Sequence, residues 1–222
     1  MSGQSTVVDA DEISLEFRIT QDLGIIKVSL FGEPPQFGIW LEEPGTGKYK
    51  TVYVTRRSAT GVWVGKLECP DCLPRWFEVF RAETGRKGFP SQDNPAPDYV
   101  IAGATPETRT FAIQTRVATG SRWICWVEMN LAGDFNSSYL DYDEEKKIAD
   151  LDLSGQPPLL FRADVEARPG KTFSLELMGQ VSRNPNGAVS IEPVSEKITT
   201  ARNVFRAIQV RVIGDLRTPV QK

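Results

Sequence analysis

Apolar and polar side chains alternate with a period of two along most of this chain. Residues 13–19 are the clearest example, because Ile, Leu or Phe occupies every odd position and Ser, Glu or Arg every even one. Such alternation is typical of a β-strand with one face in water. Similar patterns predict further strands at residues 25–31, 37–41, 49–56, 62–67, 109–117, 159–167, 172–181, near 189 and 208–213.

Residues 121–130 differ because both faces of this segment are apolar. One face carries Trp123, Cys125, Val127 and Met129, and the other carries Ile124 and Trp126. A strand that is apolar on both faces is typical of a sheet covered on both sides. We therefore expect a central strand here.

Turn residues separate these strands. Gly and Pro at residues 43–47 and 168–170 predict two hairpins, each between its flanking strands. Residues 85–97 form the longest predicted loop. Two segments predict short helices: residues 198–206, and a helix that begins at Pro74.

This second helix would carry Trp76, Phe77 and Phe80 inward. About ten strands with one or two short helices indicate an all-β protein, and we expect an antiparallel β-sandwich. A division near the long loop would leave only about five strands in each half. The pattern therefore favours a single domain over residues 13–213, between flexible polar ends at residues 1–12 and 214–222.

Composition narrows the classes of function. The 222 residues carry a net charge of −3 with both signs mixed along the chain, which argues against nucleic-acid binding. No apolar run approaches the ~18–20 residues of a transmembrane segment. The first twelve residues contain no leader, so the sequence taken literally indicates a cytoplasmic protein, while a mature exported domain stays open.

The chain contains no histidine. It therefore lacks the usual proton shuttle and the commonest metal ligand, which excludes Ser-His-Asp and Cys-His catalysis and His-ligated metals. Because no other catalytic set is assembled, we expect neither an enzyme nor a bound cofactor.

Cys69 and Cys72 form a Cys-Pro-Asp-Cys motif just before the helix predicted at Pro74. A helix amino terminus lowers the pKa of a nearby thiol, as in dithiol oxidoreductases. Redox motifs of this kind normally sit in a βαβ unit, which is absent from the pattern. A redox pair, a disulfide-closed turn and two free thiols stay open.

An oxygen-rich segment follows the predicted central strand. Asn130, Asp134 and Asn136 form a candidate binding loop, and carboxylates at residues 141–145 extend it. Such hard ligands suit Ca²⁺, although the spacing of an EF-hand is missing. The alternative is a solvated loop in which Asn136 bonds to its own backbone.

Residues 98–105 resemble the Asp-x-x-Ser-Gly-Ala-Thr signature at which a transferase attaches FMN to the final threonine. That resemblance makes Thr105 the acceptor, although one extra residue follows Asp98 and Ala102 replaces the serine. The alternative is a turn in which Gly103 supplies unusual dihedrals and Pro106 closes the turn.

Six sets of short segments between residues 25 and 213, taken in order, resemble a family of predicted periplasmic bacterial proteins of unknown function. They are residues 38–42 with 51–54, 73–76, 102–106, 127–130 with 134–136, 155–158 with 161–163, and 198–201. The family is similar to the immunoglobulin-like module of flagellar hook-capping proteins. The resemblance implies an extracytoplasmic β-sandwich, sometimes encoded beside membrane flavin and electron-transfer components. Gln180 stands where the family has a histidine.

The leading hypothesis is a non-catalytic binding protein or accessory subunit that engages a protein partner. The alternatives are an electron-transfer accessory with covalent FMN on Thr105 and a thiol switch at Cys69 and Cys72. We expect a pocket that unites residues 85–97, Thr105 and residues 130–136, because loops at strand ends commonly display binding residues.

Overall fold

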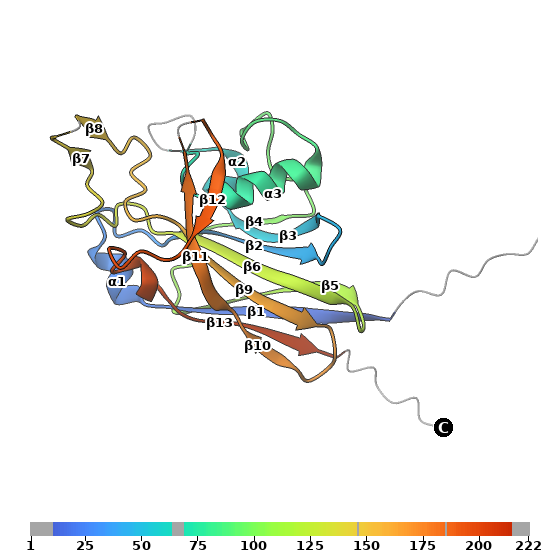
Figure 1. Cartoon of the computed structure of the whole chain (residues 1–222). Coiled ribbons are helices and arrows are strands. Elements are labelled where there is room, and N and C mark those ends of the chain that lie inside the picture. The colour runs from blue at the N-terminus through green and yellow to red at the C-terminus, as the bar shows by residue number, and fades with distance from the viewer. Residues whose placement is uncertain (1–10, 64–68, 146, 185, 215–222) are drawn as a thin grey trace, which may run out of the picture.

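Two β-sheets packed face to face form the body of the protein (Figure 1). The computed structural model describes residues 11–63, 69–145, 147–184 and 186–214. The smaller sheet has the strand order β10 (Thr172–Ser174), β13 (Phe205–Ile213), β1 (Glu12–Gln21) and β5 (Thr110–Ala118). The larger sheet has the order β12 (Val189–Glu192), β11 (Glu176–Arg183), β9 (Leu159–Glu166), β6 (Arg122–Asn130), β2 (Gln36–Glu43), β3 (Lys48–Thr55) and β4 (Ile101–Gly103).

The predicted mostly-β architecture is therefore confirmed, with two differences. The sheets are antiparallel except for β3 and β4, which run parallel. The described residues also contain more helix than expected: α1 (Leu23–Val28), α2 (Arg56–Thr60), α3 (Pro74–Thr84) and a 3-10 turn at Ala201–Asn203. A small separate hairpin pairs β7 (Tyr142–Asp143) with β8 (Ile148–Ala149).

The main core lies between the two sheets, where the alternating apolar residues of β1 are buried as predicted. A second core lies on the opposite face of the larger sheet, beneath α3. Trp76, Phe77 and Phe80 point into this second core, as the helix prediction required. Gly38 permits the close approach, because a Cβ there would lie 3.1 Å from Cγ of Trp76. The larger sheet is thus covered on both faces, and β6 is its central strand as predicted.

Glu128 joins the central strand to the helix layer. Its fully buried carboxyl group accepts hydrogen bonds from the backbone N–H groups of Arg75 (3.1 Å) and Trp76 (2.7 Å), in the first turn of α3. Burial raises the pKa of Glu128 to about 8. Glu128 belongs to none of the predicted sites, although a lone carboxylate in a doubly apolar strand is a recognisable signal.

The strand predicted at residues 25–31 is wrong, because α1 occupies this region. The Asp22 carboxylate accepts hydrogen bonds from the backbone N–H groups of Gly24 (2.8 Å) and Ile25 (3.2 Å) and so caps a helix. Residues 25–31 also lack strict alternation, and only Ile26 is buried within α1.

The segment 172–181 is divided between the sheets. β10 pairs with β13, and β11 pairs with β9, so the predicted hairpin with residues 159–167 forms only through β11. The backbone N–H of Leu175, between them, donates to the carbonyl of Ile208.

Other predicted elements are shorter than expected or lie partly outside the described residues. The helix predicted at residues 198–206 is reduced to the 3-10 turn, because β13 begins at Phe205. Most of the strand predicted at residues 62–67 lies outside the described residues, as do most of the ends predicted to be flexible. In the described part of the chain, no helix is long and apolar enough to cross a membrane.

Candidate functional site

A cavity of about 260 Å³ lies where several distant segments meet, and we call it the end pocket. Its walls come from the residues after α1, the start of β2, α2, the end of β6 and residues 152–154. Gln36, Asn130, Ser154, Arg57, Cys69 and Cys72 are among the residues that line it.

Three of these residues carry buried polar atoms that lack a hydrogen-bond partner. They are Gln36 Oε1, Asn130 Oδ1 and Ser154 Oγ, on residues that are only 2–7% exposed. A buried unpaired polar atom costs about 1–3 kcal/mol. The end pocket thus concentrates unsatisfied hydrogen-bonding capacity.

Both cysteines of the Cys-Pro-Asp-Cys motif are buried free thiols. Cys69 Sγ donates to the carbonyl of Asp152 (3.8 Å), and Cys72 Sγ lies 3.9 Å from Oγ of Ser58. Burial raises the pKa of Cys72, and the proximity of Cys69 adds to this effect. The expected lowering of a thiol pKa at the start of α3 is therefore wrong for Cys72, because desolvation outweighs the helix dipole.

Exposed apolar side chains occur in two segments that border the end pocket, residues 28–31 and 151–153. Val28, Leu30, Phe31, Leu151 and Leu153 are between 37% and 83% exposed, and we call this set the end patch. Gly133 joins its two segments, because its carbonyl accepts from the N–H of Leu30 and its own N–H donates to the carbonyl of Leu153. Phe31 and Leu153 also line the pocket, so the patch continues into it.

The predicted binding loop serves mainly to hold the structure together. Asn130 Nδ2 donates to the carbonyls of Ser154 (3.1 Å) and Gln156 (3.0 Å). The carboxylate of Asp134 accepts a hydrogen bond from the Thr200 hydroxyl, and burial raises the pKa of Asp134. The expectation of a solvated loop is therefore wrong at Asp134, which is buried.

Asn136 bonds to its own backbone, as the alternative to ion binding predicted. Its Oδ1 accepts from the N–H groups of Ser138 (2.8 Å) and Tyr139 (3.0 Å). Its Nδ2 donates to the carbonyl of Lys197 (3.0 Å). Among the described residues, no three acidic or thiol side chains come close enough together to hold a metal ion.

Thr105 follows β4 and is half-buried. Its hydroxyl accepts a hydrogen bond from Nε2 of Gln36 (3.3 Å), which places it next to a residue of the end pocket. Gly103 does not have the unusual dihedrals expected for a turn. It is required for space instead, because a Cβ there would lie 2.8 Å from the ring of Tyr53.

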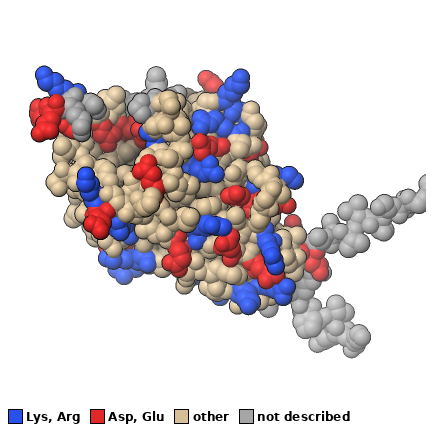
Figure 2. All heavy atoms as spheres, in the orientation of Figure 1, with Lys and Arg blue, Asp and Glu red and all other residues tan. Residues whose placement is uncertain are grey.

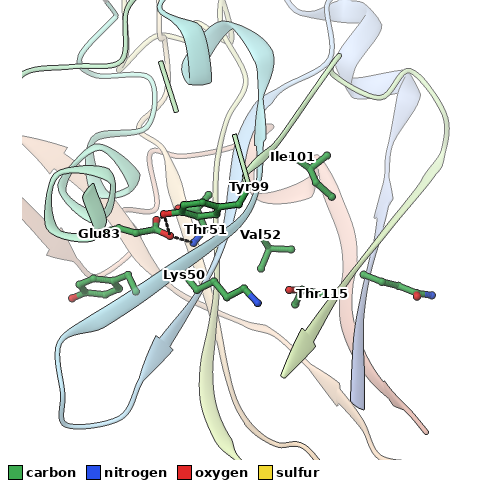
Figure 3. Close-up of a pocket in the computed structure, with 9 residues that line it drawn as sticks. Lys50, Thr51, Val52, Glu83, Tyr99, Ile101 and Thr115 are labelled. Atoms are coloured by element: carbon green, nitrogen blue, oxygen red, sulfur yellow. Dashed lines mark hydrogen bonds between the residues drawn. The ribbon is translucent and has the colours of Figure 1, made fainter. Parts of the chain in front are cut away.

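A larger cavity of about 590 Å³ lies between β3 and β5, and we call it the side groove (Figure 3). The Glu83 carboxylate accepts from the Thr51 N–H (2.9 Å), the Thr51 hydroxyl (2.6 Å) and the Tyr99 hydroxyl (2.9 Å). Lys50 donates to the carbonyl of Arg116 on β5 (3.0 Å). These contacts occupy backbone groups at the strand edges and so oppose further strand pairing.

The predicted single pocket forms only in part. The end pocket brings together Asn130, Cys69 and Cys72, and Gln36 connects it to Thr105. Asp134, Asn136 and the loop at residues 85–97 do not line it. Sequence reasoning missed Gln36, Arg57 and Ser154, which belong to no motif and meet only through the tertiary fold.

Charge does not distinguish a binding surface on the face shown in Figure 2, where acidic and basic side chains are interspersed.

Comparison of the chain with protein-family models, with curated proteins and with solved structures yields no match.

Proposed function

We propose that the protein is a non-catalytic binding protein or accessory subunit that engages a protein partner through the end patch. The observation that carries this proposal is the set of five exposed apolar side chains beside the pocket. Contiguous exposed apolar surface is typical of protein–protein contact sites, because covering it releases water from apolar area. The charged pair of Arg57 and Glu33 at the pocket supplies a polar border.

We propose further that the sandwich is of the immunoglobulin-like kind and works outside the cytoplasm. The resemblance of the ordered short segments to those of the periplasmic family supports both points. Two stacked sheets are compatible with that class.

Site-specific photo-crosslinking in cells of the source organism tests the partner surface. A crosslinking residue at position 30 should give one discrete adduct, and Leu151→Asp should abolish it. The matched control is position 178, because Met178 is also exposed but lies on β11. No adduct from position 30, or the same adduct from both positions, would reject the end patch as the partner surface.

A second candidate is an electron-transfer accessory with FMN linked covalently to Thr105. Its support is the half-buried hydroxyl of Thr105 in a loop after β4. Co-expression with the flavin transferase should add the mass of one FMN, and Thr105→Ala should prevent the addition. An unchanged intact mass in the unsubstituted protein would exclude this function.

A third candidate is a thiol switch, favoured by the position of Cys69 and Cys72 at one pocket. When the protein is unfolded in urea after mild oxidation, both thiols should be protected from alkylation together, and dithiothreitol should restore both. Cys125, buried in β6, is the internal control. If both thiols stay equally alkylated after oxidation, no switch exists.

A further inference from the structure

We propose that the end pocket binds a small organic amine, in which a primary ammonium group is attached to an apolar body. The ammonium N–H groups would donate to the unpaired acceptors of Gln36, Asn130 and Ser154. This inference goes beyond the proposed function, because it concerns the polar floor of the pocket and requires no protein partner.

The orientation of the Asn130 amide shows which kind of hydrogen-bonding group the pocket leaves unpaired. Its nitrogen donates to two backbone carbonyls, which have no hydrogen to donate in return. The free atom is therefore the oxygen, an obligate acceptor. Gln36 donates through Nε2 to the Thr105 hydroxyl in this structure, and its Oε1 has no partner. A complementary ligand must supply hydrogen-bond donors.

The charges at the pocket favour a cation over an anion. Two carboxylates, Glu33 and Asp152, line the pocket together with one guanidinium, that of Arg57. Arg57 and Glu33 pair with each other, so the excess negative charge comes from the Asp152 carboxylate. That carboxylate also accepts a hydrogen bond from the N–H of Asp71 (2.8 Å). An anionic ligand would meet acceptors and negative charge, whereas an ammonium group meets groups that stabilise it.

The remaining walls accommodate an apolar body. Phe31, Pro34, Trp63 and Leu153 line the cavity, and aromatic rings attract a nearby ammonium group. One water occupies about 30 Å³ in the liquid, so a volume of about 260 Å³ exceeds the space of a single bridging water. It lies just below the usual range for ligand pockets, which starts at about 300 Å³ and favours a small ligand here.

The side groove supports the assignment by contrast. It is larger, yet its lining carboxylate and lysine have protein partners. Of these two cavities, the end pocket is the one whose lining includes several buried polar atoms without a hydrogen-bond partner.

Titration with 2-phenylethylamine, followed by NMR and calorimetry, tests the inference. The reference probe is 2-phenylethyl methyl ether, which keeps the apolar body but has no hydrogen-bond donor. The amine should bind at the end pocket at least about tenfold more tightly than the ether, the effect of one hydrogen bond to a charged group. Equal affinities, or no binding of the amine, would overturn the proposal. The unpaired acceptors of the pocket would then be assigned to ordered water.

Substitutions of pocket residues test whether the amine binds in the end pocket. Ser154→Ala should weaken amine binding about tenfold without loss of folding, because the Ser154 hydroxyl has no protein partner. Gln36→Leu should act in the same direction. Thr115→Val, in the side groove, is the matched control and should leave the affinity unchanged. Undiminished binding to Ser154→Ala and Gln36→Leu would refute this site.

A free amine and a lysine of a bound partner present the same chemistry. If saturating 2-phenylethylamine reduces crosslinking from position 30, the ammonium belongs to the partner, and unchanged crosslinking assigns the pocket to a free amine. Leu151→Asp should abolish partner crosslinking from position 30 but leave amine affinity unchanged, because Leu151 does not line the pocket. Failure of the partner surface is therefore distinguishable from failure of the amine site.

Discussion

The end pocket and the side groove differ in how their polar groups are satisfied, and this difference outweighs their difference in size. In the side groove, Glu83 accepts three hydrogen bonds and stabilises the edge of β3. In the smaller end pocket, buried acceptors stay unpaired beside exposed apolar residues. The groove has the properties of a completed structural contact, whereas the pocket keeps unpaired acceptors and is the site proposed for ligand binding.

The largest expected effect concerns Glu128, which caps the helix whose other end carries Glu83. The folded-state pKa of Glu128, about 8, lies above its ordinary value of 4.5, so the folded protein holds this proton more tightly than the unfolded chain. This contribution to stability is fully present below about pH 4.5 and is lost as the pH rises through 8. The loss should be on the order of 4 kcal/mol.

Urea unfolding of the protein and of Glu128→Gln, from pH 5 to 8.5, measures this loss. The free energy of unfolding should fall with pH in the unsubstituted protein and stay nearly level in Glu128→Gln. Parallel curves for the two proteins would show that Glu128 titrates normally.

Asn130→Ala should have the next largest effect and would break the end pocket. The substitution leaves the carbonyls of Ser154 and Gln156 without their donor. We expect the free energy of unfolding to fall by about 3 kcal/mol. The control Asn203→Ala, which removes one long and exposed hydrogen bond, should stay within about 0.5 kcal/mol. Equal effects would indicate that Asn130 does not organise the pocket.

Glu83→Ala tests the claim that the side groove is a structural contact. Three donors lose their acceptor, and the free energy of unfolding should fall by about 2 kcal/mol in chemical denaturation. Glu78→Ala on the same helix removes a partly exposed pair with Arg75 and should cost less than about 1 kcal/mol. If Glu83→Ala leaves the free energy of unfolding unchanged, the side groove is not a structural contact.

Ser154→Ala should have the smallest effect and the opposite sign. Removing an unpaired buried hydroxyl relieves a desolvation cost, so stability should stay level or rise by up to about 1 kcal/mol. Ser121→Ala should lower stability, because the Ser121 hydroxyl donates to Ala118 and accepts from Trp123. Thermal unfolding of both variants compares the two serines, and a clear loss in Ser154→Ala would mean that its hydroxyl is already satisfied.

Local signals in the sequence were sufficient for much of the fold. The alternation of residues 13–19 predicted β1, and Pro74 with its following aromatic residues predicted α3. Both elements bury apolar residues at a regular spacing, and this spacing can be read directly from the sequence. The same reasoning failed at residues 25–31, where a short apolar run fits either a strand or a helix and the cap at Asp22 favours the helix.

The candidate site depended on contacts between residues that are distant in the sequence. Composition and motifs indicated Cys69, Cys72, Thr105 and Asn130 as separate candidates, and the lack of histidine restricted the available chemistry. Only the tertiary structure placed Gln36 and Ser154 beside Asn130 and left their acceptors unpaired. Whether a buried polar atom has a hydrogen-bond partner depends on which backbone groups from distant parts of the chain lie next to it. The local pattern of apolar and polar residues does not determine which distant groups these are.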